Sequence, residues 1–134
     1  MNKKSIIATI FIVLILGGYY IYNNMFPVAE PIQYPTIEDI ISIDVITDDN
    51  KENKILGTDF ASLVTYISNS KPTRIMSTNE SPAIKPYYKI EISTEGKTYN
   101  YYVYEDDKKL YIECPYEGIY TIDSEVVNII FKWF

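Results

Sequence analysis

Residues 87–122 read YYKIEISTEGKTYNYYVYEDDKKLYIECPYEGIYTI, and this stretch decides the fold. Three short turn signals divide it into four candidate strands, at Glu95-Gly96, at Asp106-Asp107 and at residues 115–118. Nine of the chain's fourteen tyrosines lie here, and tyrosine is a good strand former. The stretch therefore predicts an antiparallel meander of four strands.

The first turn sets the register of the first two strands. If Glu95-Gly96 is a two-residue hairpin loop, with the glycine at positive φ, one face of the hairpin pairs only apolar residues. Those pairs are Ile92 with Tyr99, Ile90 with Tyr101 and Tyr88 with Val103. The pairs on the other face are mostly polar: Ser93 with Thr98, Glu91 with Asn100 and Lys89 with Tyr102. A slip by one residue would exchange the two faces, so the pattern predicts this register.

The next two turns extend the same apolar face. A loop at Asp106-Asp107 is expected to give three further pairs: Val103 with Leu110, Tyr101 with Ile112 and Tyr99 with Cys114. After the turn at residues 115–118, Tyr120 and Ile122 continue the face beside Ile112 and Leu110. Cys114 is the only cysteine, and we expect it to be a small core residue.

Tyrosines gather on the opposite face of the same strands. Four residues form the candidate interaction surface: Tyr87, Tyr102, Tyr104 and Tyr111. Tyr102 and Tyr111 are expected to lie directly opposite each other. Cross-strand aromatic pairs stabilise sheets, so a structural role is one interpretation. If no other element covers this face, it has the composition of a recognition surface.

Residues 1–24 form a candidate membrane segment. Two lysines precede residues 5–22, which carry no charge. As a helix this run would be about 27 Å long, close to the ~30 Å hydrocarbon thickness of a bilayer. It is longer than a signal-peptide core and ends in tyrosines, so we expect an uncleaved signal-anchor, with a cleaved signal peptide as the alternative. The positive-inside rule places the N-terminus in the cytoplasm and the later residues outside.

The remaining segments predict a linker and a single domain. Residues 25–36 contain three prolines and no periodicity, which indicates an extended linker that lifts the domain off the bilayer. The domain, residues 37–134, begins with a strand at residues 38–47, where Ile41, Ile43 and Val45 share one side.

Two helices and one more short strand complete the domain. Thr58 is expected to cap a helix over residues 58–70 whose apolar face carries Phe60, Leu63, Val64 and Ile67. Residues 74–78 are interpreted as a short strand. Asp123 or Ser124 caps a final, very apolar helix. The predicted fold is α+β, with an antiparallel meander sheet covered by two amphipathic helices and preceded by one N-terminal transmembrane helix.

Composition excludes several functions. The chain has no histidine, which removes Ser-His and Cys-His catalysis and the commonest metal ligand. The domain outside the membrane carries ten Lys and Arg against eighteen Asp and Glu, a net charge of −8. That balance argues against nucleic acid, which needs a basic surface. No catalytic motif and no cofactor-binding motif is recognisable.

Two acidic patterns have alternative interpretations. Four residues fall at EF-hand positions one, three, five and twelve: Asp48, Asn50, Glu52 and Asp59. Because Asn53 replaces the glycine needed at position six, we interpret residues 48–53 as a hairpin turn. Glu91 and Glu113 are expected to flank Asn100 on the outer sheet face. We interpret them as partners in cross-strand charge pairs, with Lys89 and Lys109 nearby. The alternative is a pair of catalytic carboxylates like that of a glycosidase.

Several segments carry a family resemblance. They are Pro72-Thr73, Ser77, Asn79-Glu80-Ser81-Pro82, Tyr111-Ile112-Glu113 and Pro-Tyr-Glu-Gly-Ile-Tyr at residues 115–120. From about Pro35 to the C-terminus, the chain resembles an uncharacterised domain-of-unknown-function family of short secreted or single-anchor proteins of Gram-positive Firmicutes. The resemblance implies an extracytoplasmic location and one α+β domain, and it implies no mechanism.

These observations together predict a single-pass protein of the cell membrane whose domain lies outside the cell. We expect a module that binds a protein or peptide at the cell envelope and is not an enzyme. The alternative is an envelope enzyme or inhibitor that acts on cell-wall polymers.

Overall fold

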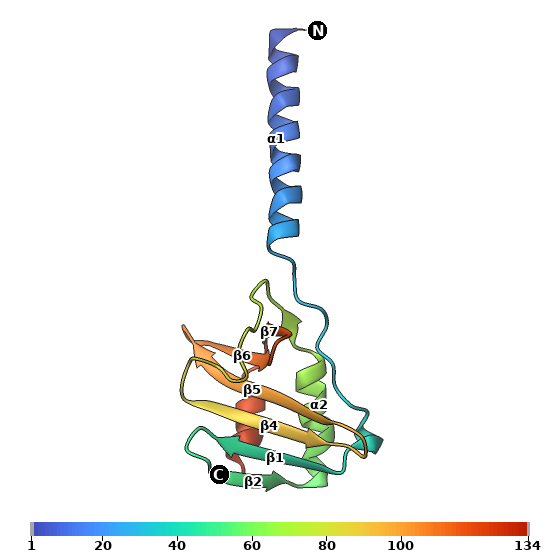
Figure 1. The fold of residues 1–134 in the computed structure, drawn as a ribbon, viewed down its shortest axis with the longest axis vertical. Coiled ribbons are helices and arrows are strands. Elements are labelled where there is room, and N and C mark those ends of the chain that lie inside the picture. The colour runs from blue at the N-terminus through green and yellow to red at the C-terminus, as the bar shows by residue number, and fades with distance from the viewer. Residues whose placement is uncertain (1, 134) are drawn as a thin grey trace.

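The computed structural model describes residues 2–133, and it places an α+β domain at the end of one long helix (Figure 1). The helices are α1 (Lys3–Met25), α2 (Phe60–Ser68) and α3 (Glu125–Phe131), with short 3-10 helices η1 (Ile37–Asp39) and η2 (Gly57–Asp59). The strands are β1 (Ser42–Thr47), β2 (Glu52–Ile55), β3 (Lys71–Pro72), β4 (Tyr87–Ser93), β5 (Thr98–Asp106), β6 (Lys109–Cys114) and β7 (Gly118–Thr121). The predicted fold class is confirmed.

Helix α1 extends away from the domain and is long and apolar enough to cross a membrane. An 18-residue window within it has a mean hydropathy of 2.1, and none of its described residues is buried against the domain. A helix with these properties is consistent with a signal-anchor or with a signal peptide.

All strands belong to one antiparallel sheet in the order β2-β1-β4-β5-β6-β7-β3. The predicted meander of residues 87–122 supplies its four consecutive strands β4 to β7. The hairpin of β1 and β2 extends the sheet at one edge, and β3 pairs with β7 at the other.

The predicted register between β4 and β5 is confirmed, because Ile90 lies opposite Tyr101 and Glu91 opposite Asn100. The loop is Glu95-Gly96, as expected. However, no glycine among residues 2–133 has a positive φ, so the expected conformation of Gly96 is wrong. The Thr94 hydroxyl donates to the Lys97 carbonyl oxygen at 2.8 Å and the Thr94 amide donates to the same oxygen at 2.9 Å, which closes the turn.

The predicted register between β5 and β6 is wrong by two residues. The loop is Asp107-Lys108, with φ of 47° and 61°, so Val103 lies opposite Ile112 and not Leu110. Two successive positive φ angles define a type I′ turn, which usually carries Asn-Gly. The Asp-Lys sequence lacks these residues, so the position of the turn could not be read from the sequence. A slip of two residues leaves every side chain on its predicted face, so the apolar face is preserved.

Helices α2 and α3 cover the apolar face of the sheet (Figure 1). The predicted inward residues Ile90, Tyr101 and Ile112 are at most 2% exposed. The helices bury an apolar set against them, namely Leu63, Val64, Ile67, Val126 and Ile130. The predicted cap at Thr58 is wrong because Thr58 lies inside η2 and Asp59 precedes α2.

The two covering helices are bonded to each other through Asp59. Its Oδ2 accepts hydrogen bonds from Lys132 Nζ at 2.9 Å and from Trp133 Nε1 at 3.1 Å. The end of α3 is therefore fixed against the start of α2, which holds both helices on the sheet.

Residues 28–35 cover the rest of the apolar face. Ala29 and Ile32 are each only 6% exposed and belong to the core. Two buried tyrosines bond to this segment, because Tyr120 donates to the Glu30 carbonyl oxygen at 2.8 Å and Tyr101 donates to that of Gln33 at 2.5 Å. The segment expected to be a spacer is extended, but it packs as part of the domain.

The segment between β3 and β4 crosses the outer face of the sheet. In Figure 1 it passes in front of β6 and β5 on its way to β4. The strand expected at residues 74–78 is absent, since β3 ends at Pro72. Ser77 and Glu113 are each 5% exposed, and the Ser77 hydroxyl donates to Glu113 Oε1 at 2.6 Å. This pair fastens the segment to the sheet.

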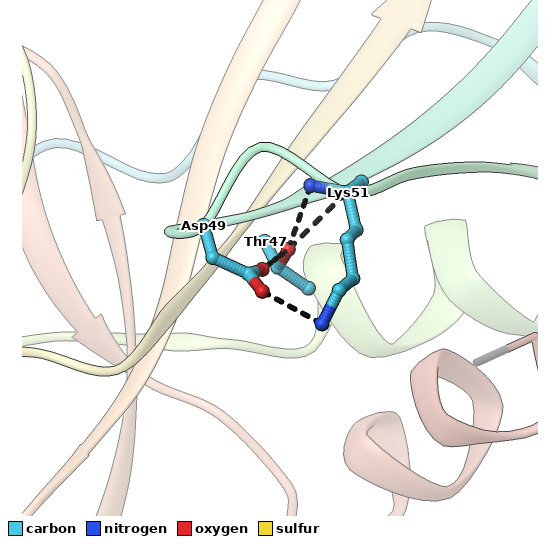
Figure 2. Close-up of polar contacts among 3 residues, drawn as sticks. All are labelled: Thr47, Asp49 and Lys51. Atoms are coloured by element: carbon cyan, nitrogen blue, oxygen red, sulfur yellow. Dashed lines mark hydrogen bonds and ion pairs between the residues drawn. The ribbon is translucent and has the colours of Figure 1, made fainter.

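The hairpin interpretation of residues 48–53 is confirmed. The strand expected at residues 38–47 is shorter than predicted. Strand β1 begins at Ser42 because residues 37–39 form η1, and Ile41, expected on the same side as Ile43 and Val45, is exposed. Figure 2 shows the turn that follows: the Asp49 carboxylate accepts a hydrogen bond from the Thr47 hydroxyl and pairs with the Lys51 ammonium at 2.7 Å. The hydrogen bond with Lys51 lowers the pKa of Asp49 and raises the pKa of Lys51.

Candidate functional site

The structure brings the four predicted tyrosines together as two ring pairs. The Tyr87 and Tyr102 rings meet edge to face with centroids 5.4 Å apart, and those of Tyr104 and Tyr111 stack at 5.9 Å. Tyr104, and not Tyr102, lies opposite Tyr111, as the corrected register requires. Burial raises the pKa of both Tyr102 and Tyr104. Tyr102 is 8% and Tyr104 5% exposed, so the middle of this surface presents little ring area to solvent.

The two carboxylates of the outer face are both engaged by neighbouring side chains. Glu91 pairs with Lys89 at 2.6 Å, and Glu113 accepts the Ser77 hydrogen bond. Glu113 lies opposite Tyr102, so the expected placement of the carboxylates on either side of Asn100 is wrong. These contacts account for both groups as parts of the sheet and its covering segment.

The EF-hand spacing does not produce a ligand cluster. Asp59 is bonded to the end of α3, whereas residues 48–53 turn at the far end of the β1–β2 hairpin. Among residues 2–133, no group of three or more Asp, Glu, His or Cys side chains is placed to hold a metal ion.

A more open site lies where the ends of the strands meet residues 30–39. Three adjoining hollows of about 160, 750 and 350 Å³ follow this segment. The first shares Tyr99 with the second and shares Gln33 and Glu117 with the third, so the three lie side by side along this segment. Opposite residues 30–39, the wall consists of the β4–β5 and β6–β7 turns. We call this feature the strand-end groove.

The strand-end groove is acidic. Its lining has one basic residue, Lys97, and five acidic ones: Glu30, Glu38, Asp39, Glu95 and Glu117. A cation entering the groove would therefore meet a field of favourable sign.

The strand-end groove is also aromatic. Tyr34 is 46% exposed and Tyr116 63% exposed, while Tyr99 is half-buried and stacks on Tyr101 with ring centroids 6.5 Å apart. Lys97 Nζ lies 4.2 Å from the centre of the Tyr99 ring, a cation–π contact within the groove itself. The groove thus combines negative charge with ring faces that accept a cation.

Neutral groups form the floor of the groove. Burial, reinforced by the nearby Glu117, raises the pKa of Cys114 to about 12, and burial raises that of Tyr120 to about 12. At neutral pH the Cys114 thiol is protonated and shielded, so it is not a ready nucleophile. Its predicted place in the core is confirmed.

The sequence contained one signal for this groove. Tyr101 and Tyr120 were both predicted to face the core, and a buried tyrosine hydroxyl needs a hydrogen-bond acceptor. An apolar helix face offers few acceptors, whereas the extended segment at residues 30–33 offers free carbonyl groups. Those carbonyls receive both hydroxyls in the structure.

Residues 28–121 match the DUF5301 family, described as a domain of unknown function (DUF5300). The chain belongs to the DUF5301 family. The match begins at Val28, just before the first core residue Ala29, so the DUF5301 domain includes the segment that walls the groove. The predicted resemblance to an uncharacterised family is confirmed.

A solved structure shares the DUF5301 fold. The NMR structure of a protein from Ruminococcus gnavus, a Firmicute, superposes with a TM-score of 0.60 at 26% sequence identity. The alignment covers 71% of this chain and 97% of that one. None of the curated proteins matches this chain. The DUF5301 domain of this chain is therefore similar in fold to a bacterial protein of known structure.

Proposed function

We propose that this protein stays in the cell membrane through α1, holds its DUF5301 domain outside the cell, and binds an extended cationic segment of a protein or peptide in the strand-end groove. The 23 residues of α1 span roughly 35 Å, which suits a hydrocarbon layer of ~30 Å. Lys3 and Lys4 at its start favour a cytoplasmic N-terminus. The groove, with its acidic and aromatic lining, is the observation that carries the binding function.

The groove is better suited to a partner than the tyrosine surface. Tyr102 and Tyr104 are buried, whereas the Tyr34 and Tyr116 side chains are largely exposed. Lysine and arginine side chains bind carboxylates and the faces of aromatic rings, and both are present in the groove. The net charge of −8 outside the membrane adds longer-range attraction for a cationic partner.

The groove is also better suited than the free sheet edge. Strand β2 is the longer of the two edge strands and has only four residues, while β3 at the other edge has two. Glu52 and Lys54 on β2 are exposed, and charged side chains on a short edge strand disfavour pairing with another strand. Recognition through side chains in the groove therefore needs less rearrangement than addition of a strand at β2.

A binding experiment tests the groove directly. The full chain in phosphatidylcholine vesicles is titrated into a fluorescent oligolysine peptide, with an oligoglutamate peptide of equal length as the comparison, and anisotropy is recorded at low and high salt. We expect binding of oligolysine only, weakened by salt because charge attraction contributes.

Matched variants separate the groove from the overall charge. The groove variant combines Glu38→Gln, Asp39→Asn and Glu117→Gln. The control removes the same number of charges from the β5–β6 turn through Glu105→Gln, Asp106→Asn and Asp107→Asn. We expect several-fold weaker peptide binding for the groove variant and little change for the control. Equal weakening by both variants would show that only the net charge matters and would refute the groove site.

A further inference from the structure

The end of α1 is bonded directly to the domain by Arg74. Its guanidinium donates from Nη2 to Asn23 Oδ1 at 2.7 Å and from Nη1 to the backbone oxygen of Phe26, and it lies 4.9 Å from the centre of the Tyr22 ring. A cation at the C-terminal end of a helix also interacts favourably with the helix dipole. Because a guanidinium is planar and rigid, three contacts on one group restrict the angle between helix and domain.

The covalent connection at this junction is short as well. Three residues separate the end of α1 from Ala29, and the Ala29 amide donates to the Thr73 carbonyl oxygen at 3.0 Å. Figure 1 shows the segment after β3 lying directly below the end of α1. The domain therefore follows the helix without a free spacer, so this end of the domain lies close to any surface that α1 leaves.

Exposed apolar side chains gather at the same place. They form what we call the junction patch: Phe26, Val28, Ile75, Met76 and Tyr116, each between 47% and 63% exposed. Ile75 is held beside β7 because its carbonyl accepts the Ile119 amide at 3.0 Å, and Met76 and Tyr116 line one hollow. Isolated exposed apolar residues are ordinary, but several beside the end of a membrane-length helix mark a membrane contact.

We propose that the junction patch lies in the headgroup region of the bilayer and that Arg74 fixes the domain there in one orientation. The inference rests on the proposed anchoring by α1. Roughly 35 Å of helix is slightly longer than a ~30 Å hydrocarbon layer, so the end of α1 reaches the headgroups, and the patch lies beside that end. Aromatic and aliphatic side chains are suited to that level, and the apolar surface continues from the helix into the patch.

This orientation also places the groove. Its third hollow is lined by Met76 and Tyr116 of the patch together with Glu30. From there the groove follows residues 30–39 towards Ile41. One end of the groove therefore opens beside the lipid and the other lies away from it, so an extended partner would leave the membrane surface along the domain.

The test compares two exposed isoleucines. Ile75→Cys and Ile41→Cys are each labelled with the fluorophore NBD in the full chain, which is then reconstituted into phosphatidylcholine vesicles. Ile75 lies at the junction, and Ile41 lies at the other end of the groove. Unchanged protein treated with the same reagent is the control for the buried Cys114. Flotation measures anchoring, circular dichroism verifies folding, and lipids with a nitroxide near the headgroup quench NBD that reaches them.

We expect NBD at position 75 to emit at shorter wavelength than NBD at position 41 and to be quenched several-fold more. Adding Arg74→Ala to the Ile75→Cys chain should reduce that quenching, while Arg74→Lys, which keeps the charge but not the planar fork, should reduce it less. Equal quenching at positions 75 and 41 in protein that floats would refute the membrane contact of the junction patch but not the anchoring by α1. Protein that does not float would refute both the anchoring by α1 and the membrane contact of the patch. Unchanged quenching in the Arg74→Ala chain would overturn the orienting role of Arg74.

Discussion

Gly118 lies directly against Ala29. A Cβ atom placed on Gly118 would be 2.6 Å from the Cβ of Ala29, well inside van der Waals contact. The φ of Gly118 is not positive, so its backbone needs no glycine. Glycine is required here by space alone, because it lets the segment that begins at Val28 lie against β7.

Gly118→Ala should lower the free energy of unfolding by roughly 1–3 kcal/mol, the usual cost of forcing an extra methyl group into a packed site. Urea denaturation of the full chain in detergent micelles, followed by circular dichroism of the sheet, measures the change. Gly57→Ala is the control, since nothing lies within 4 Å of a Cβ at Gly57.

A second substitution identifies the partner. Ala29→Gly removes the atom that Gly118→Ala would strike, so the double variant should regain much of the lost stability. If Ala29→Gly gives no recovery, the two segments do not pack as described.

Lys108→Gly should stabilise the β5–β6 hairpin. Lys108 has a φ of 61°, a conformation that costs a residue with a side chain about 1–2 kcal/mol and costs glycine almost nothing. Part of that gain is offset by the greater entropy of glycine in the unfolded chain, leaving up to ~1 kcal/mol. The same denaturation experiment detects it, and Lys109→Gly in strand β6 should destabilise instead. Loss of stability in Lys108→Gly would contradict the type I′ turn.

Ser77→Ala should destabilise the segment that crosses the outer face. It removes the Ser77 hydroxyl that donates to the buried Glu113 carboxylate, at a cost of about 1–3 kcal/mol. Thr78→Ala is the control because Thr78 is the exposed neighbour in the same segment. Hydrogen exchange of β6 amides gives a second readout, with faster exchange expected in Ser77→Ala. Identical stability and exchange in both variants would mean that the segment does not depend on Glu113.

Alkaline pH should unfold the domain. The folded-state pKa values of Cys114 and Tyr120 are raised to about 12 from ordinary values of 9.0 and 10.0. Between those limits the unfolded chain releases protons that the folded chain retains, so stability is full below pH 9 and falls as the pH rises towards 12.

The urea midpoint measured from pH 8 to pH 11 tests this dependence. In Cys114→Ala the decline should begin about one pH unit later, because the ordinary pKa of Tyr120 is 10.0 and that of Cys114 is 9.0. A midpoint that is flat from pH 9 to pH 11 would show that these groups are not buried.

The sheet was predictable because its signal is local. The alternation around Ile90 and Tyr101 fixes which side chains face inward, and the two-residue loop at Glu95-Gly96 fixes their pairing. The β5–β6 pairing failed because the Asp107-Lys108 turn lacks the residues that usually mark its conformation.

The groove and the covered outer face were less predictable because both depend on contacts between distant parts of the chain. Glu30 and Tyr120 are ninety positions apart, and Ser77 and Glu113 are thirty-six apart. An irregular segment that packs on a sheet has no periodic pattern of apolar residues from which it could be predicted. The hydroxyl groups of buried tyrosines were the one local hint, and they specified that an acceptor was needed without specifying which segment supplied it.

If an uncleaved α1 holds the DUF5301 domain outside the cell, as we propose, that domain can be labelled in intact bacterial cells. Gly57→Cys places a thiol in open space, while the buried Cys114 provides an unlabelled background. Cells are treated with a membrane-impermeant maleimide, fractionated, and the mass of the labelled chain is determined. We expect a labelled chain in the membrane fraction whose mass includes residues 1–24. A shortened chain in the medium, or a full-length chain that is labelled only after the cells are broken, would contradict it.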